Sequence, residues 1–243
     1  MAQPIELHMW PTPNGLKITI ALREMGLPYT LIPVNIGIGD QFKPEFQAIS
    51  PNGRMPAIVD HGAEDGQPLS IFESGAILQH LGRKSGQFYP QTERARADVE
   101  QWLFWQVGGL GPMAGQANHF RVYGPTFLRD QRMLAYGANR YTNEVHRLWG
   151  VADRRLADRD YLAGDYSIAD MACWPWMRSP AMHAINVDEF PNAKAWVDRI
   201  AARPAVIKAV EEGEALRLPN AAAGSGADAE KAREVLFGQR ARK

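Results

Sequence analysis

The chain of 243 residues contains a single cysteine, Cys173, and no excess of either charge, because 27 Lys and Arg residues balance 27 Asp and Glu residues. One cysteine cannot form an intramolecular disulfide, and a lone thiol is typical of a reducing compartment. A chain without net positive charge also lacks the long-range field on which non-specific nucleic-acid binding relies. We therefore expect a cytoplasmic protein that does not bind nucleic acid.

Long apolar runs and metal-ligand patterns are missing as well. No stretch approaches the length of a membrane-spanning helix, and the N-terminus lacks the basic segment and apolar run of a signal peptide. The six histidines show neither i,i+4 pairing nor a Cys-x-x-Cys motif nearby. We expect no membrane contact and no metal, and a dithiol mechanism of the thioredoxin type is excluded.

Residues 1–86 alternate short apolar runs with helical patterns, which is typical of an α/β domain. The strands are expected at 5–10, 29–35, 57–61 and 69–72, and the helices at 16–25 and 73–81. Between the last two strands, Asp65-Gly66 is a hairpin signal. The segment from Gly37 to Ser50 is predicted to be irregular.

Residues 93–216 show only helical periodicity and predict an all-α second domain. The expected helices cover about 93–120, 126–158, 167–179, 191–203 and 205–216. Three glycines and a proline within 108–112 should interrupt the first helix, and Ser167 with Asp170 forms a capping-box pattern. Residues 217–243 begin as a low-complexity linker and end in a segment whose composition allows a short basic helix, and we expect a flexible tail.

Thr12 and Asn14 follow the first strand at the start of the first helix. Free backbone N–H groups and the helix dipole favour an anion there. One interpretation is an ordinary turn and cap. The other is a hydroxyl and a carboxamide that stabilise the thiolate of a ligand. Lowering the pKa of that thiol by one unit requires about 1.4 kcal/mol of additional stabilisation of the thiolate.

Two further candidates lie at the starts of a strand and a helix. Pro56 precedes an apolar strand, either as a simple strand-initiating proline or as a cis proline that leaves the Met55 backbone free to pair with a peptide-like ligand. Ser74 begins a helix, either as a cap or as a partner for a carboxylate, while Glu73 is suited to an ammonium group. In α/β sheets, the turns that carry such residues face the same crevice when their strands run parallel.

Two features of the helical half are expected to be structural. Cys173 lies in an apolar helix start without a basic residue nearby in sequence, which indicates a buried thiol. The aromatic cluster Trp102–Trp105 is typical of a core or a subunit interface.

Taken together, the motifs resemble those of one family. The first domain carries Met55–Val59 (MPAIV) and Glu73–Gly75 (ESG), and the second carries Ser167–Asp170 (SIAD). This combination resembles a cytosolic glutathione transferase over residues 5 to about 212, with a thioredoxin-like domain followed by an all-helical domain that forms the second substrate pocket. Longer motifs resemble the bacterial nu-class disulfide-bond oxidoreductases, namely PTPNG at 11–15, GDQF at 39–42, ISPN at 49–52 and QWLFWQVGGLGPM at 101–113.

The resemblance implies a role for each candidate residue. Thr12 and Asn14 would face the sulfur of glutathione, and the backbone of Met55, before a cis Pro56, would pair with its cysteinyl unit. The remaining contacts implied are Glu73 and Ser74 for the γ-glutamyl end, Gln41 and Arg54 for the glycyl end, and Arg140 for a second glutathione. The resemblance also implies a homodimer.

The expected function is therefore glutathione-dependent reduction of small-molecule disulfides. Glutathione is the co-substrate in its reduced or disulfide form, and no protein cysteine serves as nucleophile. Two alternatives stay open. One is a glutathione S-transferase that conjugates or cleaves electrophilic substrates, and the other is a non-catalytic glutathione-binding interaction module.

Overall fold

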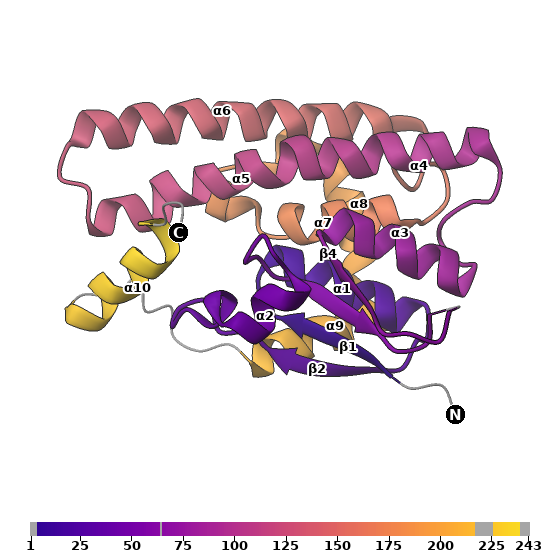
Figure 1. The fold of residues 1–243 in the computed structure, drawn as a ribbon. Coiled ribbons are helices and arrows are strands. Elements are labelled where there is room, and N and C mark those ends of the chain that lie inside the picture. Colours follow the sequence, from indigo (N-terminus) through magenta and orange to yellow (C-terminus); the bar gives the residue numbers. More distant parts are fainter. Residues whose placement is uncertain (1–3, 64, 217–225, 239–243) are drawn as a thin grey trace.

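The computed structural model describes residues 4–63, 65–216 and 226–238 of the chain. The N-terminal part is a thioredoxin-like domain, drawn in indigo and purple in Figure 1. Its elements are β1 (Ile5–Met9), α1 (Pro13–Glu24), β2 (Tyr29–Pro33), α2 (Pro44–Ile49), β3 (Ala57–Asp60), β4 (Leu69–Phe72) and α3 (Ser74–Ser85). The sheet has the order β2-β1-β3-β4, in which β1 and β2 are parallel and the other two pairings are antiparallel.

Helix α3 ends at Ser85, four residues later than predicted, and β2 ends at Pro33, two residues earlier than predicted. Two further differences have a local cause. Helix α1 begins at Pro13 rather than Leu16, because Thr12 caps the helix and a proline is well suited to the first helical position. Residues 44–49, predicted to be irregular, form the short helix α2, which again starts with a proline. A six-residue helix carries too little periodicity to be found by pattern.

The remaining described elements are helical. They are α4 (Glu93–Trp105), α5 (Gly111–Asn118), α6 (Gln131–Arg155), α7 (Ile168–Met177), α8 (Pro191–Ala201), α9 (Pro204–Ala215) and α10 (Ala227–Phe237). The predicted interruption near 108–112 is a π-helical segment, Gln106–Leu110, that joins α4 to α5. Helix α6 begins five residues later than predicted because Asp130 caps it by accepting from the backbone N–H groups of Arg132 and Met133.

The predicted capping box at the start of α7 is confirmed. The side chain of Ser167 accepts from the helix backbone, and Asp170 accepts from the backbone N–H of Ser167 over 3.0 Å. Asp170 also accepts from Leu162 N at 3.0 Å and from Trp196 Nε1 at 2.9 Å. This buried carboxylate therefore ties α7 to α8 and to the loop before α7.

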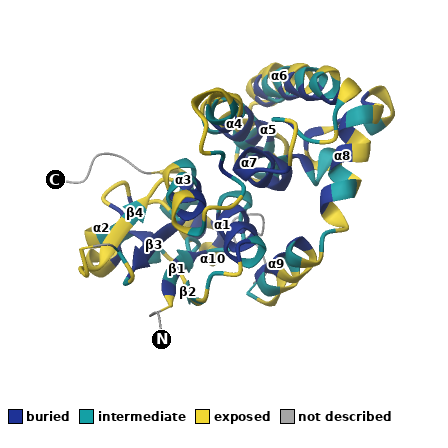
Figure 2. Cartoon of the chain, turned by 90° about the vertical axis from the view of Figure 1, so that its right-hand side faces the viewer, coloured by how far each residue is buried: buried dark blue, intermediate teal, exposed yellow. Residues whose placement is uncertain are grey.

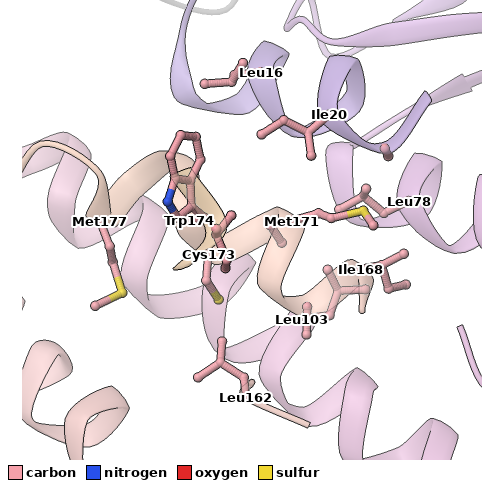
Figure 3. Packing of buried hydrophobic residues seen from close by; sticks show 14 of the residues in the cluster. Leu16, Ile20, Leu78, Leu103, Leu162, Ile168, Met171, Cys173, Trp174 and Met177 are labelled. Carbon is pink, nitrogen blue, oxygen red and sulfur yellow. The ribbon is translucent and has the colours of Figure 1, made fainter. Parts of the chain in front are cut away.

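Helix α1 lies at the centre of the molecule. Helices α1 and α3 cover one face of the sheet and α2 the other, and α1 also contacts α7 and α9 (Figure 2). Every residue from Gly15 to Leu22 is buried. Figure 3 shows Leu16 and Ile20 of α1 on the side of Met171 and Trp174 of α7. The two domains thus share one apolar core, and the N-terminus of α1 is held against both.

Helix α10 is the described part of the predicted C-terminal tail. It packs through Ala229 and Ala232, both almost fully buried, and the ring of Phe237 stacks on Phe127 with 6.0 Å between centroids. A hollow of about 350 Å³ lies between α10 and residues 125–129. Residues 217–225 and 239–243 are outside the described part of the chain, and flexibility of the tail stays a prediction.

Candidate functional site

Thr12 lies between β1 and α1 and has two hydrogen-bonding roles. Its Oγ1 accepts from the backbone N–H of Gly15 over 3.4 Å, which confirms that it caps α1. The same hydroxyl donates to Sδ of Met55 over 3.6 Å. The cap therefore leaves the hydroxyl proton free for another acceptor, and that acceptor is a sulfur atom.

Asn14 is oriented by the helical domain. Its Oδ1 accepts from the indole Nε1 of Trp176, on α7, over 3.1 Å. With the oxygen engaged, the Nδ2 group remains as the donor, and it has no hydrogen-bond partner among the described residues. The sequence patterns did not predict this contact between Trp176 and Asn14.

The loop before β3 has the predicted backbone geometry. The Met55–Pro56 peptide bond is cis. Pro56 is buried and Met55 is half-buried, and neither the N–H nor the C=O of Met55 takes part in a hydrogen bond within the described parts of the chain. The carbonyl of Arg54 accepts from Ser50 Oγ over 2.8 Å, which anchors the preceding residue.

Glu73, between β4 and α3, has a strained backbone. Its φ of 71° and ψ of 115° lie in a region that side-chain-bearing residues rarely adopt. Such a conformation costs on the order of 1–3 kcal/mol and is concentrated at functional sites. The carboxylate is exposed and accepts from Asn52 Nδ2 over 3.1 Å. Asn52 is a contact that sequence reasoning did not predict.

Ser74 has a neighbour that the sequence patterns did not single out. Its Oγ accepts from Nζ of Lys17 over 3.1 Å, and Lys17 also donates to Oε1 of Gln106 over 2.5 Å. Burial lowers the pKa of Lys17 to about 7, although the nearby Cys173 and Glu73 oppose this shift. The available signal was a lysine within a largely apolar helical run, Leu16–Leu22.

The structure therefore brings together three backbone segments and one helical-domain face. Thr12 contacts Met55 of the cis-proline loop, Lys17 links α1 to the start of α3, and Trp176 brings α7 to Asn14. This cluster offers hydroxyl and amide donors at Thr12 and Asn14, and Glu73 adds a carboxylate next to Ser74. The arrangement suits a small peptide-like molecule that carries a sulfur atom, an ammonium group and carboxylates.

Three predicted residues are not part of this contact network. Gln41 is buried, with a relative exposure of 1%. Its Nε2 donates to Ile36 O over 3.3 Å, while its Oε1 has no partner among the described residues. Arg54 is exposed, and Arg140 is exposed on α6, where its charge acts on Glu144 one turn away. Their assigned contacts stay predictions.

Cys173 has the environment that the sequence predicts. It is fully buried, and burial raises the pKa of its thiol well above the usual value. Among the described residues, no group of three or more His, Cys, Asp or Glu side chains is arranged to hold a metal ion. Nor does the described part of the chain contain a helix with the length and apolar character needed to span a membrane.

Comparison with known proteins agrees with this architecture. Residues 12–84 match the glutathione S-transferase N-terminal domain and residues 123–204 match its C-terminal domain. The disulfide-bond oxidoreductase YfcG of Escherichia coli is 49% identical over 208 residues, which cover 85% of this chain and 94% of that protein. The chain belongs to the glutathione S-transferase family.

Two solved structures are also similar. A glutathione transferase family member from Pseudomonas fluorescens, with two glutathione molecules bound, superimposes with a TM-score of 0.79 and 42% identity over 85% of this chain and 92% of its own. A glutathione transferase from Pseudomonas putida, with one glutathione disulfide per subunit, has a TM-score of 0.80 and 41% identity over 86% of this chain and 91% of its own. Members of this fold thus hold both forms of glutathione.

Proposed function

We propose that this protein is a glutathione-dependent disulfide-bond oxidoreductase of the nu-class type, which binds glutathione disulfide or two glutathione molecules. The observation that carries the proposal is the pair of donors at the start of α1. The Thr12 hydroxyl already donates to a sulfur atom, and Trp176 holds Asn14 with its NH₂ group available. The name of the similar Escherichia coli protein and the ligands of the two similar structures support the same activity.

The first glutathione would lie along the three segments of the site. The Met55 backbone pairs with the cysteinyl unit as a short added strand. The Glu73 carboxylate receives the ammonium of the γ-glutamyl end, and Ser74 at the start of α3 receives its carboxylate. We assign Gln41 and Arg54 to the glycyl end, for which the Gln41 side chain must turn outward, and Arg140 to a second glutathione.

The reaction is thiol–disulfide exchange in two steps. The thiolate of bound glutathione attacks one sulfur of the substrate disulfide, the S–S bond breaks, and the departing thiolate takes a proton. A second glutathione thiolate then attacks the mixed disulfide, which yields glutathione disulfide and the second reduced thiol. Thr12 O–H and Asn14 N–H donate to the first thiolate and raise its fraction near neutral pH.

No protein thiol is required in this scheme. Cys173 is fully buried, and its pKa is raised, so it forms little thiolate at neutral pH. We further propose that the protein is a cytoplasmic homodimer. The exposed aromatic side chains of Phe104 on α4 and Phe72 on β4 support a subunit interface.

The test is steady-state reduction of 2-hydroxyethyl disulfide by glutathione, coupled to glutathione reductase. Thr12→Val removes the hydroxyl and keeps the shape, and we expect it to lower kcat by about 10²-fold. Thr12→Ser keeps both the cap and the donor and serves as the matched control. Equal turnover of the Val variant and the wild type would remove Thr12 from the mechanism.

Binding and activity assays of the wild-type protein distinguish the two alternative functions. Glutathione disulfide binding without disulfide reduction contradicts the proposed activity. In that case, activity with a chloro-aromatic substrate indicates a conjugating transferase, and binding with neither activity indicates a non-catalytic module.

A further inference from the structure

Lys17 is a buried lysine that the proposed reaction does not use. Its side chain is 1% exposed and lies one helical turn beyond Asn14 on α1. Its two acceptors, Ser74 Oγ at 3.1 Å and Gln106 Oε1 at 2.5 Å, are both neutral. In this orientation the Oε1 of Gln106 accepts from Lys17, while the Nε2 of the same amide has no partner within the described residues.

This burial is costly because an ammonium group loses its hydration and gains no carboxylate in return. Buried charges in proteins are normally paired, yet no described carboxylate lies within ion-pair distance of Lys17. Two ionisable groups act on it from the packed elements. Glu73 is hydrogen-bonded to Asn52 at the surface, and Cys173 on α7 is kept neutral by its raised pKa.

Ser74 connects this cation to the proposed ligand site. Because Ser74 Oγ accepts from Lys17, the proton of its hydroxyl remains to be donated elsewhere. The residue also begins α3, whose first backbone N–H groups have no intrahelical partner and receive no capping side chain within the described part of the chain. A carboxylate placed there receives the hydroxyl proton and has a cation directly behind it.

We propose that Lys17 is a positioning residue whose ammonium, acting through the Ser74 hydroxyl, is the counter-charge for the carboxylate of the γ-glutamyl end of glutathione, so that ligand binding is coupled to uptake of a proton. This inference rests on the proposed glutathione site. It adds a cation that lies behind the site rather than in contact with the ligand.

The direction of the pH effect follows from the environment of Lys17. In the free protein burial holds its pKa at about 7, so the amine is mostly neutral at pH 8. A bound carboxylate favours the charged form and raises the pKa, and the complex therefore holds more protons than the free protein. By linkage, affinity for glutathione disulfide should be about tenfold weaker at pH 8 than at pH 6.

The experiment is isothermal titration of the full chain with glutathione disulfide, which has no thiol proton to release. Titrations at pH 8 in buffers of different ionisation enthalpy give the number of protons exchanged. We expect the wild type to take up close to one proton per ligand. Lys17→Met should lose this uptake and bind with the same reduced affinity at pH 6 and pH 8, whereas Lys194→Met, an exposed lysine on α8, should behave as the wild type.

The outcomes separate this inference from the proposed function. Wild-type binding without proton uptake, or full uptake and affinity in Lys17→Met, overturns the role of Lys17 and leaves the glutathione site in place. If Lys17→Met does not fold, the affinities of the wild type at pH 6 and pH 8 decide the question, because equal values contradict the coupling. Absence of glutathione disulfide binding at both pH values overturns the proposed function itself.

Discussion

The indole N–H of Trp176 on α7 donates to Oδ1 of Asn14 on α1 over 3.1 Å, across the boundary between the two domains. The oxygen of an amide that is held in this way cannot rotate toward the ligand. The orientation of a donor in the N-terminal domain is thus decided by a residue of the helical domain. Loss of the hydrogen bond from Trp176 to Asn14 is therefore expected to act on the chemistry of the sulfur.

Trp176→Phe should therefore lower turnover while preserving the fold. The ring still fills its place, but the Asn14 amide is free to rotate, and we expect kcat for 2-hydroxyethyl disulfide to fall about tenfold. Trp174→Phe is the matched control on the same helix, since its indole donates to Val197 O over 3.0 Å, away from the site. It should lower the free energy of unfolding by about 1–2 kcal/mol and leave kcat unchanged. Equal kcat values for both variants would contradict the orienting role of Trp176.

Because the backbone of Glu73 is strained, a glycine variant at this position is expected to be more stable than an alanine variant. Glu73→Gly relieves the positive φ of 71°, whereas Glu73→Ala retains it. We expect the Gly variant to be more stable than the Ala variant by about 1 kcal/mol in urea unfolding. Both variants lose the carboxylate and should bind glutathione disulfide equally weakly. An Ala variant with wild-type affinity would remove Glu73 from the ligand site.

Cys173→Ala should leave the reaction intact. The thiol is fully buried among apolar side chains (Figure 3), so its removal creates a small cavity that costs about 1–2 kcal/mol of stability. Turnover with 2-hydroxyethyl disulfide is expected to equal that of the wild type at temperatures well below unfolding. Loss of activity in a variant with an unchanged circular dichroism spectrum would show that a protein thiol takes part.

Phe104 is expected to lie in the subunit interface. It is 63% exposed on α4 and belongs to the aromatic cluster Trp102–Trp105, which is typical of a core or a subunit interface. Phe104→Glu places a charge in that interface and should convert the dimer into a monomer in sedimentation velocity experiments. Ile207→Glu, at an exposed position of α9, is the control and should leave the sedimentation coefficient unchanged. A wild-type monomer at micromolar concentration would contradict the proposed dimer.

Much of the fold follows from local patterns in the sequence. The strand 69–72 is found where it was expected, and Ser167 with Asp170 marks the start of α7 because a capping box is a local motif. The errors have local causes too. Helix α2 is too short to show a period, and the start of α6 depends on the cap at Asp130.

The candidate site was only partly predictable. The motifs located Thr12, Asn14, Glu73 and Ser74, because turn residues between strands and helices mark such positions. They could not show that Gln41 is turned inward, since the burial of one side chain depends on how its loop packs. Nor could they distinguish a cap at Thr12 from a donor to sulfur, and in the structure one hydroxyl does both.

The sequence by itself determined the class of the fold and the order of its elements, together with the residue types available at each turn, because these depend on short-range periodicity and backbone preference. Only the tertiary structure decided that Lys17 lies behind Ser74, outside ion-pair distance of every described carboxylate, and that Trp176 orients Asn14. These pairs are separated by 57 and 162 residues, and their contacts arise only when α3 and α7 pack against α1. Burial and electrostatics are properties of that packing, and no local pattern encodes them.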